Sequence, residues 1–229
     1  MGENAKPAVD EGLAILSSLP PWASAKNAFE KRRELGRGSF GVVWQAVLHP
    51  GTQGPGRNVA LKFVTCTPKG SSRLHDGKVA IAAAEVHFGQ EAARIGGEAA
   101  KDKLAIAEEA WWNQAGQRVS MRLAPRPCSL AGYILGLSTT QIPEGLLPAL
   151  LEDTSAAVAY LHTLGPGFLH RDIKPANILS GGVPEVTSHG TQGRPSLNCC
   201  LADVWDHVFQ GPGARRWRTA SHDVRVCCA

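Results

Sequence analysis

One short stretch of this sequence brings together side chains that could do chemistry. Between Asp172 and Asn177 it places a carboxylate, an ammonium (Lys174) and a carboxamide. Apolar residues stand on both sides, at 168–169 and at 178–179. Apolar flanks of this kind anchor a polar loop on a scaffold, so that its reactive groups stay in place. The stretch therefore predicts a catalytic or binding loop held between two buried anchors.

A glycine pattern near the start of the chain could approach phosphate groups. Glycines stand at Gly36, Gly38 and Gly41, which gives the spacing G-x-G-x-x-G. The spacing alone is a weak signal, because dinucleotide-binding folds place it before a helix. Here residues 42–48 are β-branched and aromatic, which favours a strand. A strand–turn–strand hairpin can fold over phosphates because missing side chains let backbone N–H groups come close, and Phe40 would cap its turn.

A lysine in the next apolar segment is the third candidate. Residues 59–64 read Val-Ala-Leu-Lys-Phe-Val, a buried-looking strand with Lys62 in its middle. A lysine inside an apolar strand is costly unless its ammonium finds an anion. For an isolated residue, an edge-strand lysine that points to water would be the better interpretation. The glycine pattern upstream favours the other interpretation, in which the Lys62 ammonium lies beside an anion.

In chain order, the glycine pattern, the lysine and the polar loop resemble motifs of the protein kinase family of the serine/threonine type. His170-Arg171-Asp172, with an asparagine five residues after the aspartate, is similar to the family's catalytic loop. The glycine pattern and the lysine are similar to its nucleotide-binding motifs. Lys174 resembles the lysine with which serine/threonine kinases contact the transferred phosphate. The resemblance implies an α+β fold, with an antiparallel β-sheet N-lobe that carries one main helix and an incomplete, mostly helical C-lobe after it.

The resemblance also implies ATP and Mg²⁺ as cofactors and a protein as the substrate. Phosphoryl transfer is mostly positioning and charge neutralisation, so it needs cations, metal ligands and one group that orients the attacking hydroxyl. By resemblance, Asp172 would accept or orient the hydroxyl proton, with Lys174 beside it. Asn177 and Asp203 would bind Mg²⁺. The residues expected around ATP are Leu35, Gly36, Gly38, Ser39, Phe40, Gly41, Val43, Ala60, Lys62 and Glu108.

The glutamate that pairs with the lysine in this family is ambiguous here. Residues 79–115 are alanine-rich and predict helical structure, and they contain several glutamates. We favour Glu108, because Trp112 shares its helical face and because strands are predicted directly after it. Glu91 is the alternative. The choice of Glu108 implies an insertion before the helix.

The remaining elements are assigned in family order. Strands at 119–123 and 132–137 would complete the N-lobe, residues 138–140 would form the hinge that meets adenine, and an amphipathic helix would run from about 143 to 164. The apolar face of that helix would hold Leu147, Leu150, Leu151, Thr154, Val158 and Leu161. The domains are then a flexible extension (1–27), an N-lobe that binds ATP (28–140) and a partial C-lobe (141–229).

Beyond Leu179 the resemblance becomes weak. Residues 180–198 are rich in glycine, serine, threonine and proline, and they do not predict the short hairpin that the family has there. Asp203 follows two apolar residues, but no glycine comes after it. We therefore expect a C-lobe that is truncated or degenerate after the catalytic loop.

The composition favours a soluble intracellular protein, cytoplasmic or nuclear, and a monomer. Hydrophobic residues make up 43% of the 229, which is enough for a core. The net charge of +4 is mild and the basic residues are spread along the chain, which argues against nucleic-acid binding. The six cysteines form no CxxC spacing, so a zinc site is not predicted. No signal peptide or membrane-length apolar run occurs, so no membrane contact is expected.

Two functions from different classes follow. The first is ATP-dependent phosphorylation of serine or threonine on proteins, because the three motifs stand in the right order. The second is a kinase-like nucleotide-binding or regulatory module without catalysis, because the metal motif is eroded, and a truncated kinase fragment would look the same. A small-molecule phosphotransferase is a weaker third, since such enzymes share the aspartate and the asparagine but seldom the whole string at 170–175.

Overall fold

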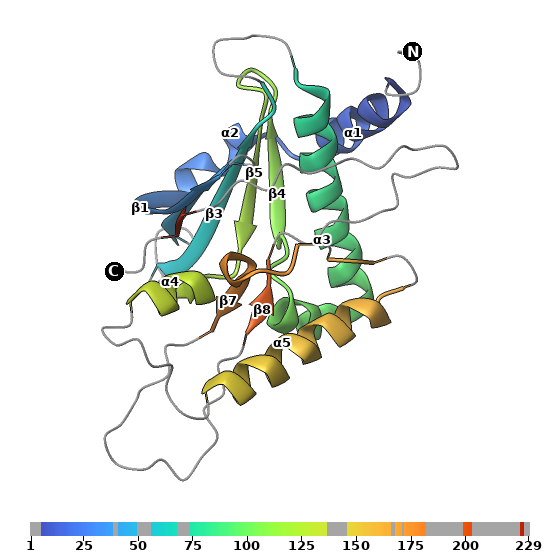
Figure 1. Ribbon diagram of the computed structural model, residues 1–229. Helices are drawn as coiled ribbons and strands as arrows, with labels where there is room; N and C mark the ends of the chain where they lie inside the picture. The colour runs from blue at the N-terminus through green and yellow to red at the C-terminus, as the bar shows by residue number, and fades with distance from the viewer. Residues whose placement is uncertain are drawn as a thin grey trace.

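The structure is a computed structural model that describes residues 6–38, 41–49, 56–67, 74–136, 146–165, 168–170, 172–181, 199–202 and 225–226. The fold contains a large six-stranded sheet and a small three-stranded sheet (Figure 1). The large sheet contains β1 (Phe29–Gly38), β2 (Gly41–Leu48), β3 (Arg57–Thr65), β4 (Glu109–Asn113), β5 (Arg118–Leu123) and β9 (Arg225–Val226). The small sheet contains β6 (Cys128–Ser129), β7 (Ile178–Ser180) and β8 (Cys200–Leu201). The α-helices are α1 (Lys6–Ser18), α2 (Trp22–Ala25), α3 (Asp76–Lys103), α4 (Leu130–Gly136) and α5 (Leu146–Thr163).

The large sheet is antiparallel, in the order β4-β5-β3-β2-β1-β9. Its first hairpin closes at the pair formed by Gly38 and Gly41. The centre of β3 is buried, because residues 59–64 are apolar apart from one lysine and have neighbouring strands on both sides. Together with the helices, this antiparallel sheet confirms the predicted α+β class.

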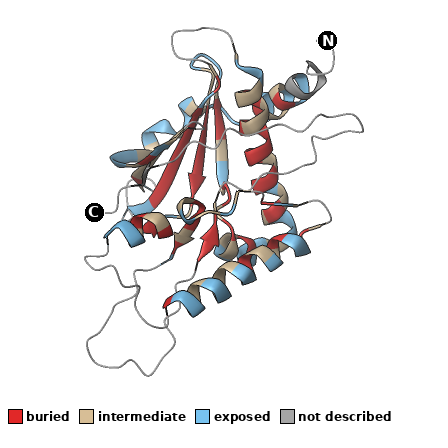
Figure 2. Ribbon diagram, in the orientation of Figure 1, coloured by how far each residue is buried: buried red, intermediate tan, exposed pale blue. Residues whose placement is uncertain are grey.

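Helix α3 lies along one face of the large sheet and supplies much of the core (Figures 1 and 2). Val79, Ala83 and Val86 are almost fully buried, and they pack in one cluster with Val64 and Met121 of the sheet. Alanines on this face let the helix come close to the strands, because protein interiors are packed without voids. The sheet and α3 therefore form one rigid unit.

The end of α3 differs from the helix predicted at 79–115. The helix ends at Lys103 and has a kink at Gly97, where φ is +55°. Strand β4 then occupies part of the predicted helix, because Trp111 and Trp112 become buried against the sheet. Aromatic burial in a paired strand outweighs the weak helix propensity of the residues around it.

A helix lies within the segment that the sequence predicts as a flexible extension, at 1–27. Helix α1 covers residues 6–18, and its Leu16 is fully buried in the core cluster that contains α3. Further along, the Trp112 N–H donates to the Pro20 carbonyl at 3.0 Å. Residues 13–16, which read Leu-Ala-Ile-Leu, are thus part of the fold, because they cover apolar surface of α3.

The chain crosses from the large sheet to the small sheet earlier than predicted. Strand β5 ends at Leu123, and Cys128 already pairs with Ser180 of the small sheet. Residues 124–127 therefore connect the two sheets, whereas the sequence predicts the boundary between the lobes at 140. The segment predicted as a strand at 132–137 is mostly helix α4. The predicted hinge residues 138–140 lie outside the described residues.

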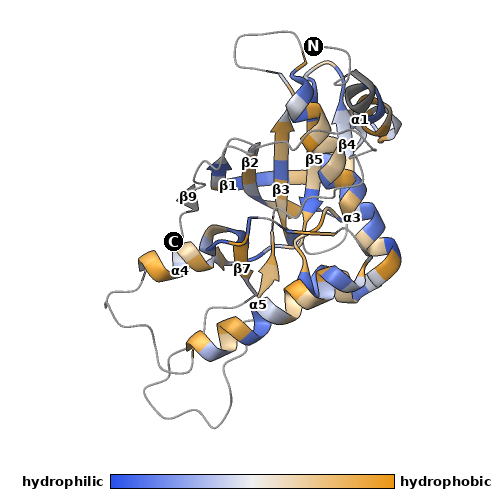
Figure 3. Cartoon of the chain, turned by 45° about the vertical axis from the view of Figure 1, so that its right-hand side comes forward, coloured by the Kyte–Doolittle hydropathy of each residue, from blue (hydrophilic) through white to orange (hydrophobic). Residues whose placement is uncertain are grey.

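Helix α5 confirms the predicted amphipathic helix, and Leu150, Val158 and Leu161 of the predicted face pack in the core. Leu146 and Leu161 are buried, whereas Leu147 and Leu151 are 51% and 58% exposed. Leu135 of α4 is 84% exposed, and Figure 3 shows hydrophobic stretches on both helices. Among the described helices, none combines the length and the hydropathy needed to cross a membrane.

A hairpin also exists where the sequence did not predict one. Strands β7 and β8 pair antiparallel, with Ile178 opposite Leu201 and Leu179 opposite Cys200. The Ala105 N–H donates to the Leu201 carbonyl at 2.8 Å, which ties β8 to the segment after α3. The paired segments are only three and two residues long, which is too short for an alternating pattern to be recognised in the sequence.

Candidate active site

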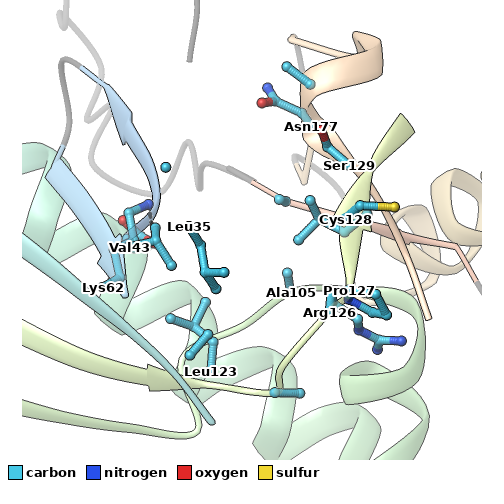
Figure 4. A pocket seen from close by; sticks show the side chains of 17 residues that line it. Leu35, Val43, Lys62, Ala105, Leu123, Arg126, Pro127, Cys128, Ser129 and Asn177 are labelled. Carbon is cyan, nitrogen blue, oxygen red and sulfur yellow. Dashed lines mark hydrogen bonds and ion pairs between the residues drawn. The ribbon is translucent and has the colours of Figure 1, made fainter. Parts of the chain in front are cut away.

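A cleft of about 130 Å³ lies between the large sheet and the small sheet. Figure 4 shows Leu35, Val43 and Lys62 on one side and Asn177 and Ser129 on the opposite side. The residues that line it are Leu35, Gly36, Val43, Ala60, Lys62, Glu85, Ala105, Leu123, Ala124, Arg126, Pro127, Cys128, Ser129, Ala176, Asn177, Leu179 and Ala202. The cleft is thus mostly apolar, with one ion pair on the large-sheet side and the polar side chains of Arg126, Ser129 and Asn177 on the small-sheet side.

The ion pair joins Lys62 of β3 to Glu85 of α3. The distance from Lys62 Nζ to Glu85 Oε1 is 2.7 Å, and the two side chains are 9% and 11% exposed. A charge removed from water to this extent is stable only when an opposite charge and hydrogen bonds compensate it. The pair also fixes the ammonium at the cleft wall, where an anionic ligand could reach it. The expectation that Lys62 lies beside an anion is therefore met within the chain by Glu85.

The prediction of Glu108 as the partner of Lys62 is wrong. Glu108 lies after the end of α3, and its Oε2 is 3.0 Å from Nη1 of Arg122 on β5. The Glu108 N–H donates to the Arg122 carbonyl at 2.8 Å, which keeps the residue at the edge of the sheet. The alternative, Glu91, is wrong as well, since its carboxylate contacts Arg94 at 2.6 Å on the surface of α3.

A sequence signal could have identified Glu85. It stands within a run of apolar and small residues at 79–86 and is the single charged residue there. That is the same pattern that singled out Lys62, because a buried charge in an apolar segment needs a partner. Two such charges in separate apolar segments are natural candidates for one buried pair.

The stretch at 172–177 folds into a compact loop, in which a 3₁₀ turn covers Pro175–Asn177. The Asn177 side-chain amide donates to the Asp172 carbonyl at 2.9 Å and to its Oδ2 at 3.0 Å. Lys174 Nζ lies 2.9 Å from the same Oδ2. The Asp172 side chain remains 40% exposed, whereas Asn177 is almost fully buried. The loop therefore orients one carboxylate toward solvent with two donors.

Buried groups on both sides anchor this loop, but one of the predicted apolar anchors, Leu169, is 42% exposed. His170 is 3% exposed and its Nδ1 lies 3.4 Å from the Asp172 N–H. After the loop, Ile178 enters strand β7 and is buried. The Ala202 N–H donates to the Asn177 carbonyl at 2.8 Å, so the end of β8 also holds the loop. Arg171 and Asp203 lie outside the described residues.

The glycine hairpin stands above the cleft and requires a glycine at position 41. Gly41 has a φ of +148°, and a Cβ there would lie 2.3 Å from the Phe63 carbonyl oxygen. Only glycine fits such an approach of strand β3, because a side chain would collide with backbone. Gly36, Val43 and Ala60, all expected near the nucleotide, line the cleft. Ser39 and Phe40 lie outside the described residues.

The residues that could hold a divalent cation are few. Asn177 presents a carboxamide at the cleft, and oxygen is the ligand atom that Mg²⁺ takes in proteins. Within the part of the chain that the structure describes, no group of three His, Cys, Asp or Glu residues could bind a metal by itself. Asp203, the other predicted ligand, lies outside the described residues. Asn177 alone would leave most positions around a cation to water or to a ligand's own oxygens.

Two buried thiols at strand β8 are poor nucleophiles. Burial raises the pKa of the Cys199 thiol to about 12 and that of Cys200 to about 11. A thiol with such a pKa is almost entirely protonated at neutral pH, and the thiolate is the reactive form.

Sequence reasoning also missed the connection at 124–127. Arg126 lines the cleft, and its Nη2 donates to the Lys101 carbonyl at 2.9 Å near the end of α3. Two prolines flank this arginine, at Pro125 and Pro127. The prolines were a signal for an extended connection, because proline fixes φ and donates no hydrogen bond.

Comparisons with known proteins agree with this geometry at a coarse level. No family profile matches the chain. It is 28% identical over 183 residues to receptor-like kinase TMK4 of Arabidopsis thaliana, which covers 79% of this chain and 18% of that protein. It is 39% identical over 82 residues to receptor-interacting serine/threonine-protein kinase 3 of Rattus norvegicus, covering 35% of this chain and 14% of that protein. For the human protein of that name, the identity is 28% over 189 residues, which cover 80% of this chain and 28% of that protein.

The matches are distant, and the chain spans less than a third of the length of each of these relatives. All three carry the word kinase in their names. This weak homology supports a relationship to protein kinases and a kinase-like function in general.

Proposed function

We propose that this chain binds ATP with Mg²⁺ in the cleft and transfers the terminal phosphate to serine or threonine of a protein substrate. The observation that carries the proposal is the buried Lys62–Glu85 pair, which opens onto the same cleft as Asn177. A fixed ammonium on one wall and a carboxylate oriented by the opposite loop are the two groups that phosphoryl transfer needs most.

The large-sheet side of the cleft would hold the nucleotide. Leu35, Val43 and Ala60 provide apolar surface for the adenine ring, and the connection at 124–127 would meet its polar edge. The backbone of the glycine hairpin would lie over the phosphates, because the missing side chains leave N–H groups accessible. Lys62 would neutralise phosphate charge, while Glu85 keeps its ammonium in position.

The loop at 172–177 would act on the substrate hydroxyl. Asp172 would orient the hydroxyl and accept its proton, since its carboxylate is exposed and held by two donors. Lys174 would stabilise charge on the transferred group, which favours serine and threonine chemistry by resemblance. Asn177 with Asp203 would hold Mg²⁺, which neutralises charge on the phosphates when bound.

A kinase-like module that binds nucleotide without transfer is the second candidate. Val204 and Trp205 follow Asp203 where the family has phenylalanine and glycine, so the metal motif departs from the family pattern. The nucleotide wall and the loop do not depend on that glycine. Binding without catalysis would follow if the departure misplaces the metal.

A paired measurement separates the two candidates. Nucleotide binding and phosphate transfer from Mg²⁺-ATP to a general protein substrate would be measured for the purified wild type, Lys62→Ala and Asp172→Asn. The enzyme proposal predicts that Asp172→Asn keeps nucleotide affinity and lowers transfer by roughly 10²- to 10⁴-fold. Binding that Lys62→Ala weakens, with no transfer by the wild type, would leave the module and exclude the enzyme. No binding by the wild type would exclude both.

A further inference from the structure

Helix α1 packs closely on α3. Leu16 is fully buried in the cluster that contains Val79 and Ala83 of α3. One turn earlier, a Cβ on Gly12 would lie 3.4 Å from the Ala83 Cβ and 3.4 Å from Val79 Cγ1. Gly12 and Leu16 stand four residues apart and so share one face of α1. The glycine sets a short distance between the helices, and the leucine fills the space beside it.

The chain after α1 is tied to the large sheet. The Pro20 carbonyl accepts a hydrogen bond from the Trp112 N–H at 3.0 Å, and Pro21 forms a parallel bridge with Trp112. Trp22 stacks on Phe29 with ring centroids 5.7 Å apart. Figure 1 shows α1 beside the upper half of α3. The N-terminal segment therefore connects α3 to strand β4 at the edge of the sheet.

The contact lies close to Glu85. Ala82 and Val86, both in the same core cluster, stand within one turn of Glu85, and Val79 and Ala83 lie on the turns before it. One helical turn rises about 5.4 Å, so a tilt of this half of α3 moves the carboxylate directly. The ion pair tolerates little movement, because its hydrogen bond weakens steeply beyond normal length.

The other end of α3 is held separately. A Cβ on Gly96 would collide with the Tyr160 hydroxyl of α5, and Arg126 donates to the Lys101 carbonyl at 2.9 Å. The kink at Gly97 lies between these contacts. The turns of α3 before Glu85 are held by the sheet and by α1, whereas Phe88 and Ala92, which follow it, pack in a second cluster with α5.

From these contacts we propose that α1 is a positioning element of the cleft, in which Gly12 and Leu16 keep Glu85 within reach of Lys62. Where it concerns nucleotide affinity, this inference rests on the proposed function. Gly12 and Leu16 touch no ligand. They act through α3, so their effect requires the carboxylate of Glu85.

The test compares two variants of α1 in two backgrounds. Leu16→Ala removes the buried side chain, and Gly12→Leu separates the helices without leaving a cavity. Ser17→Ala, an exposed neighbour on the same helix, is the control. Each is made in the wild type and in Glu85→Gln. The readouts are the dissociation constant of Mg²⁺-ATP, the urea midpoint, and the rate at which acetyl-N-hydroxysuccinimide labels Lys62, followed by mass spectrometry.

The two α1 variants should weaken Mg²⁺-ATP binding about tenfold in the wild type, the loss of roughly one charged contact. In the Glu85→Gln background the same variants should change affinity less than twofold. Labelling of Lys62 should accelerate toward the Glu85→Gln rate, and Ser17→Ala should behave as the wild type. An equal loss of affinity in both backgrounds would show a merely structural role and overturn the inference.

Lys62 labelling keeps the inference separate from the proposed function. If the wild type binds no nucleotide, the proposed function fails and labelling alone decides on α1. Faster labelling in folded Gly12→Leu would then support positioning, and labelling at the wild-type rate would overturn it. Should Leu16→Ala unfold, Gly12→Leu provides the same comparison.

Discussion

The large-sheet part (the large sheet with α1 and α3) and the small-sheet part (the small sheet with α4 and α5) hold their polar groups in opposite ways. In the first, Lys62 and Glu85 are 23 residues apart in sequence, come from a strand and a helix, and are nearly buried. In the second, Asp172 and Lys174 meet within one loop and stay 40% and 26% exposed. The first arrangement exists only if the sheet and α3 pack correctly. The second forms locally, and its exposed groups are available for chemistry.

Removing a lysine from each pair should show this difference most strongly. Lys62→Ala leaves the Glu85 charge buried without its main partner and should cost about 3–5 kcal/mol of unfolding free energy. Lys174→Ala breaks a pair that water already screens and should cost about 1 kcal/mol or less. Urea unfolding measures both. A double change, Lys62→Met with Glu85→Leu, should recover most of the loss, and equal costs for the two single lysine variants would refute the contrast.

Leucines of α5 test how well the small-sheet part is packed. Leu161 is fully buried and Leu151 is 58% exposed. Leu161→Ala should therefore lower the unfolding free energy by about 2–5 kcal/mol, whereas Leu151→Ala should change it by about 0.5 kcal/mol or less. Thermal unfolding compares the two variants. A cost for Leu151→Ala as large as that for Leu161→Ala would mean that Leu151, which the sequence places on the same apolar face, is buried as well.

Two glycines, one in each part, should differ in a smaller way. Gly41→Ala forces a side chain against the Phe63 carbonyl at a φ of +148° and should cost about 1–3 kcal/mol. Gly136→Ala meets nothing within 4 Å at the end of α4 and should stay within about 0.5 kcal/mol. Urea midpoints suffice for the comparison. Unchanged stability in Gly41→Ala would contradict the close approach of the hairpin to β3.

The pH dependence of stability should show the smallest effect. Burial raises the pKa of the Cys200 thiol from 9.0 to about 11. Because the folded pKa is the higher one, the stabilisation is complete below pH 9 and is lost as the pH rises toward 11. At pH 10 the loss should be about 1 kcal/mol, and Cys200→Ala should make the profile flatter by that amount. Identical alkaline slopes in the two proteins would show that the thiol is not protected.

The features that sequence could predict are the local ones. The three motifs and the helix at 146–163 follow from spacing and periodicity within short windows, and the α+β class follows from the family resemblance that the motifs carry. The loop at 172–177 could be recognised because its contacts lie within six residues. The hairpin of β7 and β8 was missed, because its short strands carry too few residues for a pattern.

Long-range contacts decided what sequence could not. The partner of Lys62 depends on where α3 ends, and that end is set by the burial of Trp111 and Trp112 in β4. A reading of residues 79–115 as one helix put Glu108 on the wrong element. The order of the N-terminal segment has the same origin, since Leu16 finds its partners on α3 and on the sheet.

The most direct test of the account compares two glutamates. Mg²⁺-ATP would be titrated calorimetrically into the wild type, Glu85→Gln and Glu108→Gln, of which the last disturbs the pair with Arg122 instead. The account predicts one saturable site, an affinity about tenfold weaker in Glu85→Gln, and an affinity within twofold of the wild type in Glu108→Gln. Equal affinities for all three proteins, or a loss confined to Glu108→Gln, would contradict the assignment of the cleft and of its ion pair.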